Sequence, residues 1–164
     1  MKELVLIRHA KSSWKDETLI DFDRPLNKRG KENAPKMAKF LKRIVENPDL
    51  IISSPSKRTR LTLEYFLKEF SCEKEIIFED KIYETPFLNL LGVLKNIDSE
   101  NNLVFLIGHN PALNNLADFL LGGFSENIPT SGILKINLDL ISWNKIDRKC
   151  GELDFFYYPK MLNI

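Results

Sequence analysis

The sequence has few residues of the kind that cross-link a fold. It contains two cysteines among 164 residues, Cys72 and Cys150, and neither lies in a CxxC pair or beside a histidine. This pattern excludes a zinc knuckle and a disulfide framework, and it favours a reduced, cytoplasmic protein. A chain of this length buries about two-thirds of its unfolded surface, so we expect a stable core without a disulfide bond or a structural metal ion.

Long apolar runs and a strong net charge are also missing. The apolar run at residues 4–7 stops at Arg8, so we expect no signal peptide, and later runs are too short to cross a bilayer. The formal net charge is +1, so nothing in the overall charge predicts a nucleic-acid or membrane partner. Residues 1–60 nevertheless carry 15 basic and 8 acidic side chains. This bias favours an anionic ligand, although a solvated basic helix over residues 28–43 explains most of it.

The apolar pattern predicts alternating strands and helices. Strands are expected at residues 3–7, 49–53, 75–78 and 102–107, followed by an antiparallel pair at 133–141 and 153–158. Helices are expected up to residue 45 and at 56–70, 87–97 and 111–121. Pro35 requires that the first helix either begin near Asn33 or bend. The fold class is therefore α/β, with residues 1–164 forming one three-layer α/β/α domain around a mainly parallel sheet.

Basic and imidazole side chains follow the predicted strands. His9 and His109, the two histidines of the chain, each come directly after a strand. Arg8 precedes His9, and Arg58 follows the second strand. Functional sites of parallel α/β sheets lie beyond the carboxyl ends of the strands, so adjacent strands would bring these four side chains together. Arginines bind phosphate oxygens, one imidazole can attack phosphorus, and the second can donate hydrogen bonds to the equatorial oxygens. Spacing alone leaves open the alternative of structural histidines and surface arginines.

The same residues resemble the motifs of the histidine phosphatase superfamily. Arg8-His9-Ala10 resembles its first signature, residues 53–62 (SSPSKRTRLT) with Arg58 the second, and Gly108-His109 the third. Three segments resemble the SixA-type phosphohistidine phosphatase branch in particular: KSSW (11–14), DFDRPLNKRG (21–30) and APKMAKFL (34–41). The resemblance covers nearly the whole chain and implies a phosphoglycerate mutase-like fold.

The resemblance implies catalytic roles for the four residues. His9 would be the nucleophile that becomes phosphorylated, and water would then release inorganic phosphate. Arg8 and Arg58 would clamp the phosphoryl oxygens, and His109 would complete the phosphate pocket. No metal or other cofactor is expected, because the arginine and histidine side chains supply the positive charge.

Further residues have two interpretations each. Ser12 and Asn110 are expected to contact substrate, although Asn110 would more ordinarily cap the helix that begins at Pro111. Glu84, in the sequence IYETP, is either the general acid or a surface residue that caps the next helix. Asp21, Asp23 and Arg24 either orient the loop beside the pocket or form a local ion-pair cluster. A position at the rim of the site is the weaker interpretation of Thr130, Ser131 and Gly132.

Three functions remain open at this point. The first is removal of phosphate from phosphohistidine on a phosphotransfer protein, which needs no positioned acid because the leaving nitrogen is readily protonated from solvent. The second is a small-molecule phosphate monoesterase that uses Glu84 as its acid, and the third is a non-catalytic module that binds phosphate or a phosphopeptide. Only 50 residues separate Arg58 from His109, which leaves little chain to cover the pocket. An open, shallow site favours a phosphorylated residue on another protein as the substrate. We expect a monomer.

Overall fold

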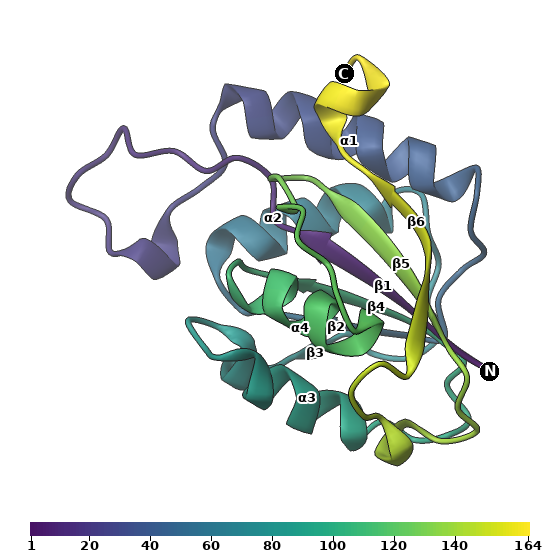
Figure 1. The fold of residues 1–164 in the computed structure, drawn as a ribbon. Coiled ribbons are helices and arrows are strands. Elements are labelled where there is room, and N and C mark those ends of the chain that lie inside the picture. Colours follow the sequence, from purple (N-terminus) through teal and green to yellow (C-terminus); the bar gives the residue numbers. More distant parts are fainter.

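One sheet of six strands forms the centre of the molecule (Figure 1). The computed structural model describes residues 1–164, and the strand order is β3-β2-β4-β1-β5-β6. The strands are β1 Lys2–Arg8, β2 Leu50–Ser53, β3 Ile77–Phe78, β4 Leu103–Gly108, β5 Ile133–Leu138 and β6 Gly151–Tyr157. The first four run parallel, and β5 and β6 are antiparallel to their neighbours. This arrangement confirms the mainly parallel sheet and the antiparallel carboxyl-terminal pair.

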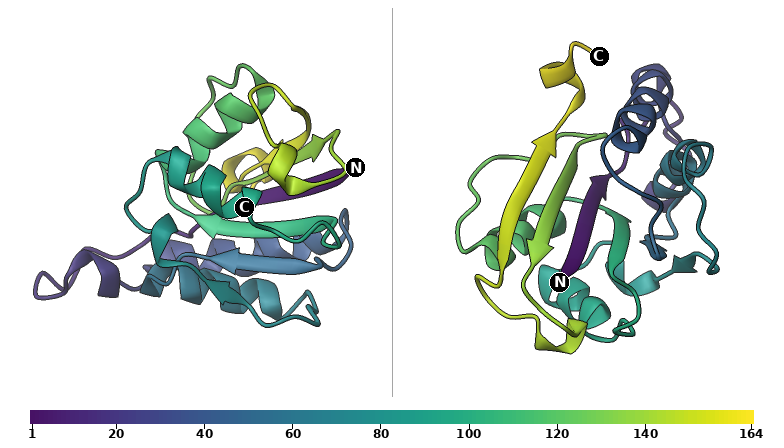
Figure 2. Two further views of the ribbon diagram at one scale, coloured as in Figure 1. Left: turned by 90° about the horizontal axis from the view of Figure 1, so that it is seen from below. Right: turned by 90° about the vertical axis from the view of Figure 1, so that its right-hand side faces the viewer.

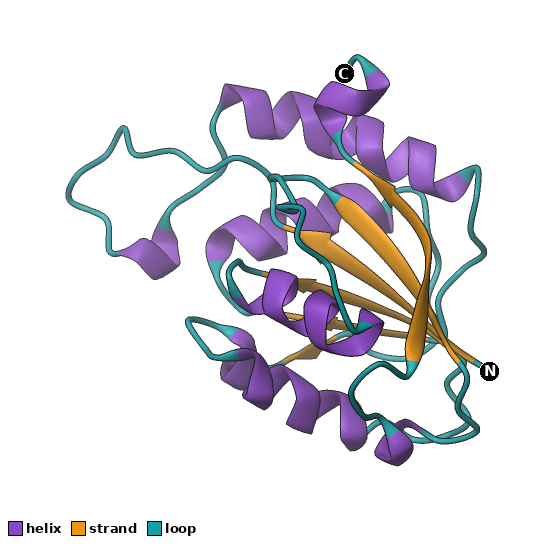
Figure 3. Ribbon diagram, in the orientation of Figure 1, coloured by secondary structure: helices purple, strands orange, loops and turns teal.

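Helices cover both faces of the sheet (Figures 2 and 3). They are α1 Lys28–Lys42, α2 Lys57–Leu67, α3 Phe87–Lys95 and α4 Ala112–Leu121. Side chains of β1 alternate between two cores: Leu4 and Leu6 pack with α3 and α4, whereas Val5 and Ile7 pack with α1 and α2. Burial on both faces explains why the central strands are almost wholly apolar. None of these helices has the length and apolarity needed to cross a membrane.

The first helix begins earlier than near Asn33. Asn27 caps α1 by accepting a hydrogen bond from the Gly30 amide at 2.8 Å, which fixes the helix start at Lys28. Pro35 therefore lies inside the helix, which continues through it although proline cannot supply the usual backbone donor.

Three strands are shorter than expected or begin at another residue. The strand expected at 75–78 contains only Ile77 and Phe78, which pair with Ile52 and Ser53 at the end of β2, its one neighbour in the sheet. β5 ends at Leu138 rather than at residue 141, and β6 begins at Gly151, two residues before the expected residue 153. Between them the chain folds back so that Trp143 is buried and its indole N–H donates to the Asn101 carbonyl at 2.7 Å.

Gly30 lets α1 approach the chain that follows β1, and this contact yields a stability prediction. An alanine Cβ at residue 30 would lie 2.2 Å from the Lys11 carbonyl oxygen, which also accepts the Asn27 amide at 2.9 Å. We expect Gly30→Ala to destabilise the fold by roughly 1–3 kcal/mol, despite the helix propensity of alanine. Gly92→Ala in α3 is the matched control, because its Cβ would meet nothing within 4 Å. It should stabilise by about 0.5–1 kcal/mol. Urea unfolding measures both, and stabilisation by both substitutions would contradict the close contact.

Candidate active site

The two histidines lie side by side at the carboxyl edge of the sheet. β1 and β4 pair in parallel with Arg8 opposite Gly108, so the residue that follows each strand is a histidine at the same level. The ring centroids of His9 and His109 are 5.1 Å apart, and each residue is 8% exposed. The structure thus brings together the two imidazoles that the sequence places at strand ends.

Hydrogen bonding fixes the tautomer of His9. Its Nδ1 lies 2.8 Å from the Ala10 carbonyl oxygen, which can only accept, so Nδ1 carries the proton and Nε2 keeps a lone pair. The Ala10 amide in turn donates to the Thr62 hydroxyl of α2 at 2.9 Å. Burial, together with the charges of His109, Arg58 and Arg8, lowers the pKa of His9 to about 3. The imidazole is therefore neutral at physiological pH, the form that can act as a nucleophile.

His109 is held by the end of β2 and by α2. Its Nε2 lies 2.7 Å from the Ser54 hydroxyl, and its Nδ1 faces Arg58 Nη2 at 3.4 Å. Because a guanidinium only donates, the proton of His109 belongs on Nε2. Burial and the charge of Arg58 lower the pKa of His109 to about 4, so this ring is also neutral.

Arg8 and Arg58 supply the positive charge of the site. Arg8 donates from Nη1 to the Ile128 carbonyl at 2.9 Å, whereas its Nε is buried without a hydrogen-bond partner. Burial and the nearby Arg58 lower the pKa of Arg8. A buried donor without a partner is unfavourable, and an anion bound between the two guanidiniums would satisfy it. The arrangement is suited to a phosphate group. The structure has no group of three or more His, Cys, Asp or Glu side chains arranged to hold a metal ion.

Asp21 links the site to the loop that follows β1. Its carboxylate accepts from Arg24 Nη1 at 2.9 Å, from Arg58 Nη2 at 3.0 Å and from the Tyr83 hydroxyl at 2.7 Å. Burial raises the pKa of Asp21, but the Tyr83 hydrogen bond and the charge of Arg58 outweigh it and lower the pKa. Asp21 therefore forms a local ion pair with Arg24 and also holds Arg58. Asp23, by contrast, is exposed and its side chain forms no hydrogen bond.

Tyr83 is a site residue that the sequence analysis did not single out. Its ring lies edge-on to His109, with centroids 5.6 Å apart, and its hydroxyl donates to Asp21. Burial and the Asp21 carboxylate raise the pKa of Tyr83, so the hydroxyl keeps its proton. The available signal was its position directly before Glu84, in the loop already considered for a catalytic acid.

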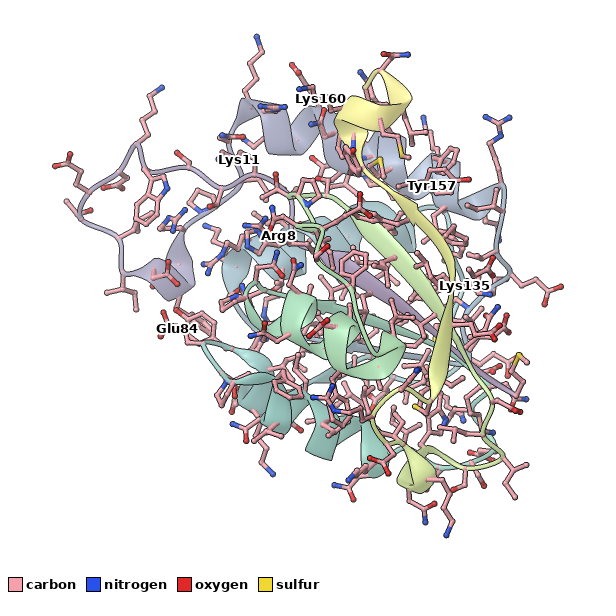
Figure 4. All side chains as sticks on the ribbon, in the orientation of Figure 1. Arg8, Lys11, Glu84, Lys135, Tyr157 and Lys160 are labelled. Atoms are coloured by element: carbon pink, nitrogen blue, oxygen red, sulfur yellow. The ribbon has the colours of Figure 1, made fainter.

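Glu84 lies outside the cluster of buried groups. It is exposed, has a φ of +46°, and lies at the outer edge of the molecule in Figure 4, farther out than Arg8. The expectation that Glu84 caps the next helix is wrong, because α3 begins at Phe87 without a side-chain cap. No contact in the structure assigns it the role of an acid, so that role stays a prediction.

The two other expected substrate contacts already have protein partners. The Ser12 hydroxyl accepts from Arg24 Nη2. The Asn110 side chain accepts from the Asn114 amide at 3.1 Å and donates to the Ile128 carbonyl at 2.9 Å. Asn110 thus stabilises the first turn of α4 through the Asn114 amide, but Pro111 rather than Asn110 occupies the N-cap position, and the helix has no side-chain cap. Substrate contact by Ser12 and Asn110 stays a prediction.

The segment 130–132 lies directly beside the first histidine. The Ser131 amide donates to the His9 carbonyl at 3.1 Å, and the Gly132 carbonyl accepts from the Arg8 amide at 3.0 Å. The Ser131 hydroxyl is buried without a partner. Ser131 and Gly132 therefore contact His9 and Arg8 directly through their backbones. A position at the rim of the site was the weaker of the two expectations for this segment.

Comparison with known proteins agrees with this geometry. Residues 4–102 match the model of the histidine phosphatase superfamily (branch 1). An uncharacterised chloroplast protein of Arabidopsis thaliana is 34% identical over 134 residues, which cover 74% of this chain and 60% of that protein. Phosphoserine phosphatase 1 of Hydrogenobacter thermophilus is 41% identical over 88 residues, covering 51% of this chain and 39% of the enzyme. The chain therefore spans less than two-thirds of the length of either relative.

A solved structure matches over nearly the full length of both chains. It is the crystal structure of the Agrobacterium tumefaciens protein that carries the name phosphohistidine phosphatase SixA. The TM-score is 0.83 at 27% identity, and the alignment covers 96% of this chain and 98% of that one.

The low pKa values of the two histidines predict a specific pH dependence. In the folded protein, the pKa values of His9 and His109 are about 3 and about 4, below the ordinary value of 6.5. Between these pKa values and pH 6.5, the unfolded chain therefore binds more protons than the folded protein does. Stability should therefore be full above pH 6.5 and fall as the pH drops from about 6.5 towards 4. Imidazole NMR titration tests the cause directly, because the chain has two histidines and the variants His9→Ala and His109→Ala assign them. A midpoint near 6.5 for either ring would contradict the buried, neutral pair.

Proposed function

Because the chain belongs to the histidine phosphatase superfamily (branch 1), we propose that it removes phosphate from phosphohistidine on another protein. The observation that carries the proposal is the neutral His9, which keeps a free Nε2 and lies within electrostatic reach of Arg58 and of Arg8, whose Nε has no partner. This is a nucleophile next to an anion site, which the first half-reaction requires.

The first step transfers the phosphoryl group to the enzyme. Arg8 and Arg58 bind the phosphoryl oxygens and neutralise their charge. His9 Nε2 attacks phosphorus in line with the leaving nitrogen, so a new P–N bond forms while the substrate P–N bond breaks. The substrate imidazole leaves after taking a proton from solvent. His109 lies beside the transferring group and can donate a hydrogen bond to its oxygens once it turns from Ser54.

The second step regenerates the enzyme. Water attacks the phosphorus of phospho-His9, the P–N bond breaks, and inorganic phosphate leaves. The Ala10 carbonyl still accepts from Nδ1 throughout, so the same ring nitrogen, Nε2, is released for the next turnover.

The acid–base character of the site supports a phosphoramidate substrate. Glu84 is exposed, and the Asp21 carboxylate has a lowered pKa and three hydrogen-bond donors. Neither group is set to protonate a leaving alkoxide, whereas the nitrogen of a phosphohistidine takes its proton from water. The full-length likeness to the SixA-named structure supports the same substrate.

The strongest alternative is a phosphate monoesterase acting on a small molecule. The observation in its favour is the 41% identity to phosphoserine phosphatase 1, which extends over only 88 residues. In that case Glu84 would have to swing towards the pocket and act as the acid. A non-catalytic phosphate-binding module is the third possibility, and the complete set of two histidines and two arginines opposes it.

Turnover measurements distinguish these functions. We expect the wild type to dephosphorylate a phosphohistidine-bearing protein domain faster than any of a panel of phosphate monoesters, without added metal. His9→Ala should lower turnover by on the order of 10³-fold or more, because the nucleophile is lost. Glu84→Gln should leave turnover of phosphohistidine within about twofold, since the leaving nitrogen is protonated by solvent.

Two results would contradict the proposal. Preference for a monoester, with a large loss in Glu84→Gln, would identify a small-molecule phosphatase. Binding of inorganic phosphate without turnover of any substrate would identify a binding module.

A further inference from the structure

Two buried polar side-chain atoms of the structure have no hydrogen-bond partner, and both belong to residues that adjoin His9. One is Arg8 Nε, and the other is the hydroxyl oxygen of Ser131. Ser131 is only 1% exposed, so water at the surface does not satisfy its hydroxyl. A buried hydroxyl without a partner lowers the stability of the fold. The proposed reaction uses Arg8 but leaves Ser131 without a role.

Hydrogen bonds fix Ser131 next to both His9 and Arg8. The Ser131 amide donates to the His9 carbonyl at 3.1 Å, and the Arg8 amide donates to the carbonyl of the next residue, Gly132, at 3.0 Å. Arg8 also donates from Nη1 to the Ile128 carbonyl at 2.9 Å. Because Arg8 binds Gly132 with its amide and Ile128 with its guanidinium, its side chain runs along the segment between these two residues. Ser131 belongs to that segment, and the unpartnered Nε lies between the two contacts along the Arg8 side chain.

The backbone of Ser131 is also unusual. Its φ is +62°, in the left-handed region that glycine adopts freely and serine adopts rarely. Glycine at this position would remove both the backbone strain and the unpartnered hydroxyl. Ser131 thus combines two unfavourable features in one residue that is hydrogen-bonded to His9. Such a combination is typical of functional sites, where a ligand supplies the missing interaction.

The charge beside Ser131 selects an anion as that ligand. Arg8 takes part in none of the ion pairs of the structure, so no protein carboxylate balances its charge. Arg8 Nε can only donate a hydrogen bond, and a serine hydroxyl can donate one as well. A phosphoryl oxygen accepts from two donors at once and carries the negative charge that the guanidinium lacks.

We propose that the Ser131 hydroxyl is a further ligand of the phosphoryl group and donates to an oxygen that also accepts from Arg8 Nε. This assignment rests on the proposed function, and it adds an uncharged donor to the two arginines and His109. Because the Ser131 amide is bonded to the His9 carbonyl, the hydroxyl is held in place before the phosphoryl group arrives. A donor held in this way stabilises negative charge without rearrangement.

Binding of inorganic phosphate, compared with stability in its absence, tests the assignment. We expect Ser131→Ala and Ser131→Gly to raise the Kd for phosphate in isothermal titration calorimetry by about tenfold or more, because a hydrogen bond to a charged group is lost. Without phosphate, the urea midpoint of Ser131→Ala should not fall, because the lost hydroxyl had no partner. That of Ser131→Gly should not fall either, because glycine relieves the positive φ. For a phosphohistidine-bearing domain, kcat/KM should fall by about tenfold or more in both variants.

Ser56→Ala is the matched control for stability. The Ser56 hydroxyl is buried like that of Ser131, but it lies 2.7 Å from the Thr59 hydroxyl. Removal of a buried hydroxyl that has a partner leaves the partner unsatisfied, so the urea midpoint of this variant should fall.

Each contrary result has a distinct meaning. Phosphate affinity unchanged in both Ser131 variants would show that the hydroxyl does not bind the anion and would overturn the assignment, while the proposed function stands. Loss of affinity together with a lower urea midpoint in both variants would identify a structural role and would also overturn it. A wild type that binds phosphate through Ser131 but does not turn over phosphohistidine would contradict the proposed function alone. A wild type that does not bind phosphate would contradict both.

Discussion

The parallel register of β1 against β4 is the constraint on which the site depends. With Arg8 opposite Gly108, the two strands deliver His9 and His109 to the same edge of the sheet, with ring centroids 5.1 Å apart. A slip of one residue would point Arg8 to the other face and separate the imidazoles. The apolar faces of the sheet, covered by helices on both sides, hold that register, so the core specifies the geometry of the polar edge.

Burial gives this edge its chemical character. Both imidazoles are kept neutral by desolvation and by the two neighbouring cations, so His9 keeps the lone pair on Nε2. Asp21 balances the charge of Arg58, whereas Arg8 has a buried Nε without a partner. The site therefore has an unbalanced positive charge and an unpartnered donor at Arg8 Nε, which is what the proposed binding of a phosphoryl group requires. The same carboxylate that balances Arg58 also accepts a hydrogen bond from Arg24, and so connects the loop that follows β1 to the site.

The strands could be predicted from the sequence because burial on both faces makes them almost wholly apolar. The closeness of the two histidines could be predicted because the carboxyl ends of parallel strands lie at the same edge of the sheet. Other features depend on contacts distant in sequence. Tyr83 and Asp21 are 62 positions apart, and no local spacing reveals their hydrogen bond. β3 pairs only with the last two residues of β2, and the start of α1 depends on the Asn27 cap rather than on Pro35. The positive φ and the exposure of Glu84 are likewise not evident from the local sequence IYETP.

The proposed mechanism requires that the phosphoryl group pass through His9. Rapid mixing of the enzyme with a ³²P-labelled phosphohistidine domain, followed by an alkaline quench that preserves phosphohistidine, tests it most directly. We expect a transient label that is stable in base and labile in acid, located on His9 by mass spectrometry and absent from His9→Ala. Release of free phosphate in step with loss of substrate, with no labelled enzyme at any time, or a label on another residue, would contradict it.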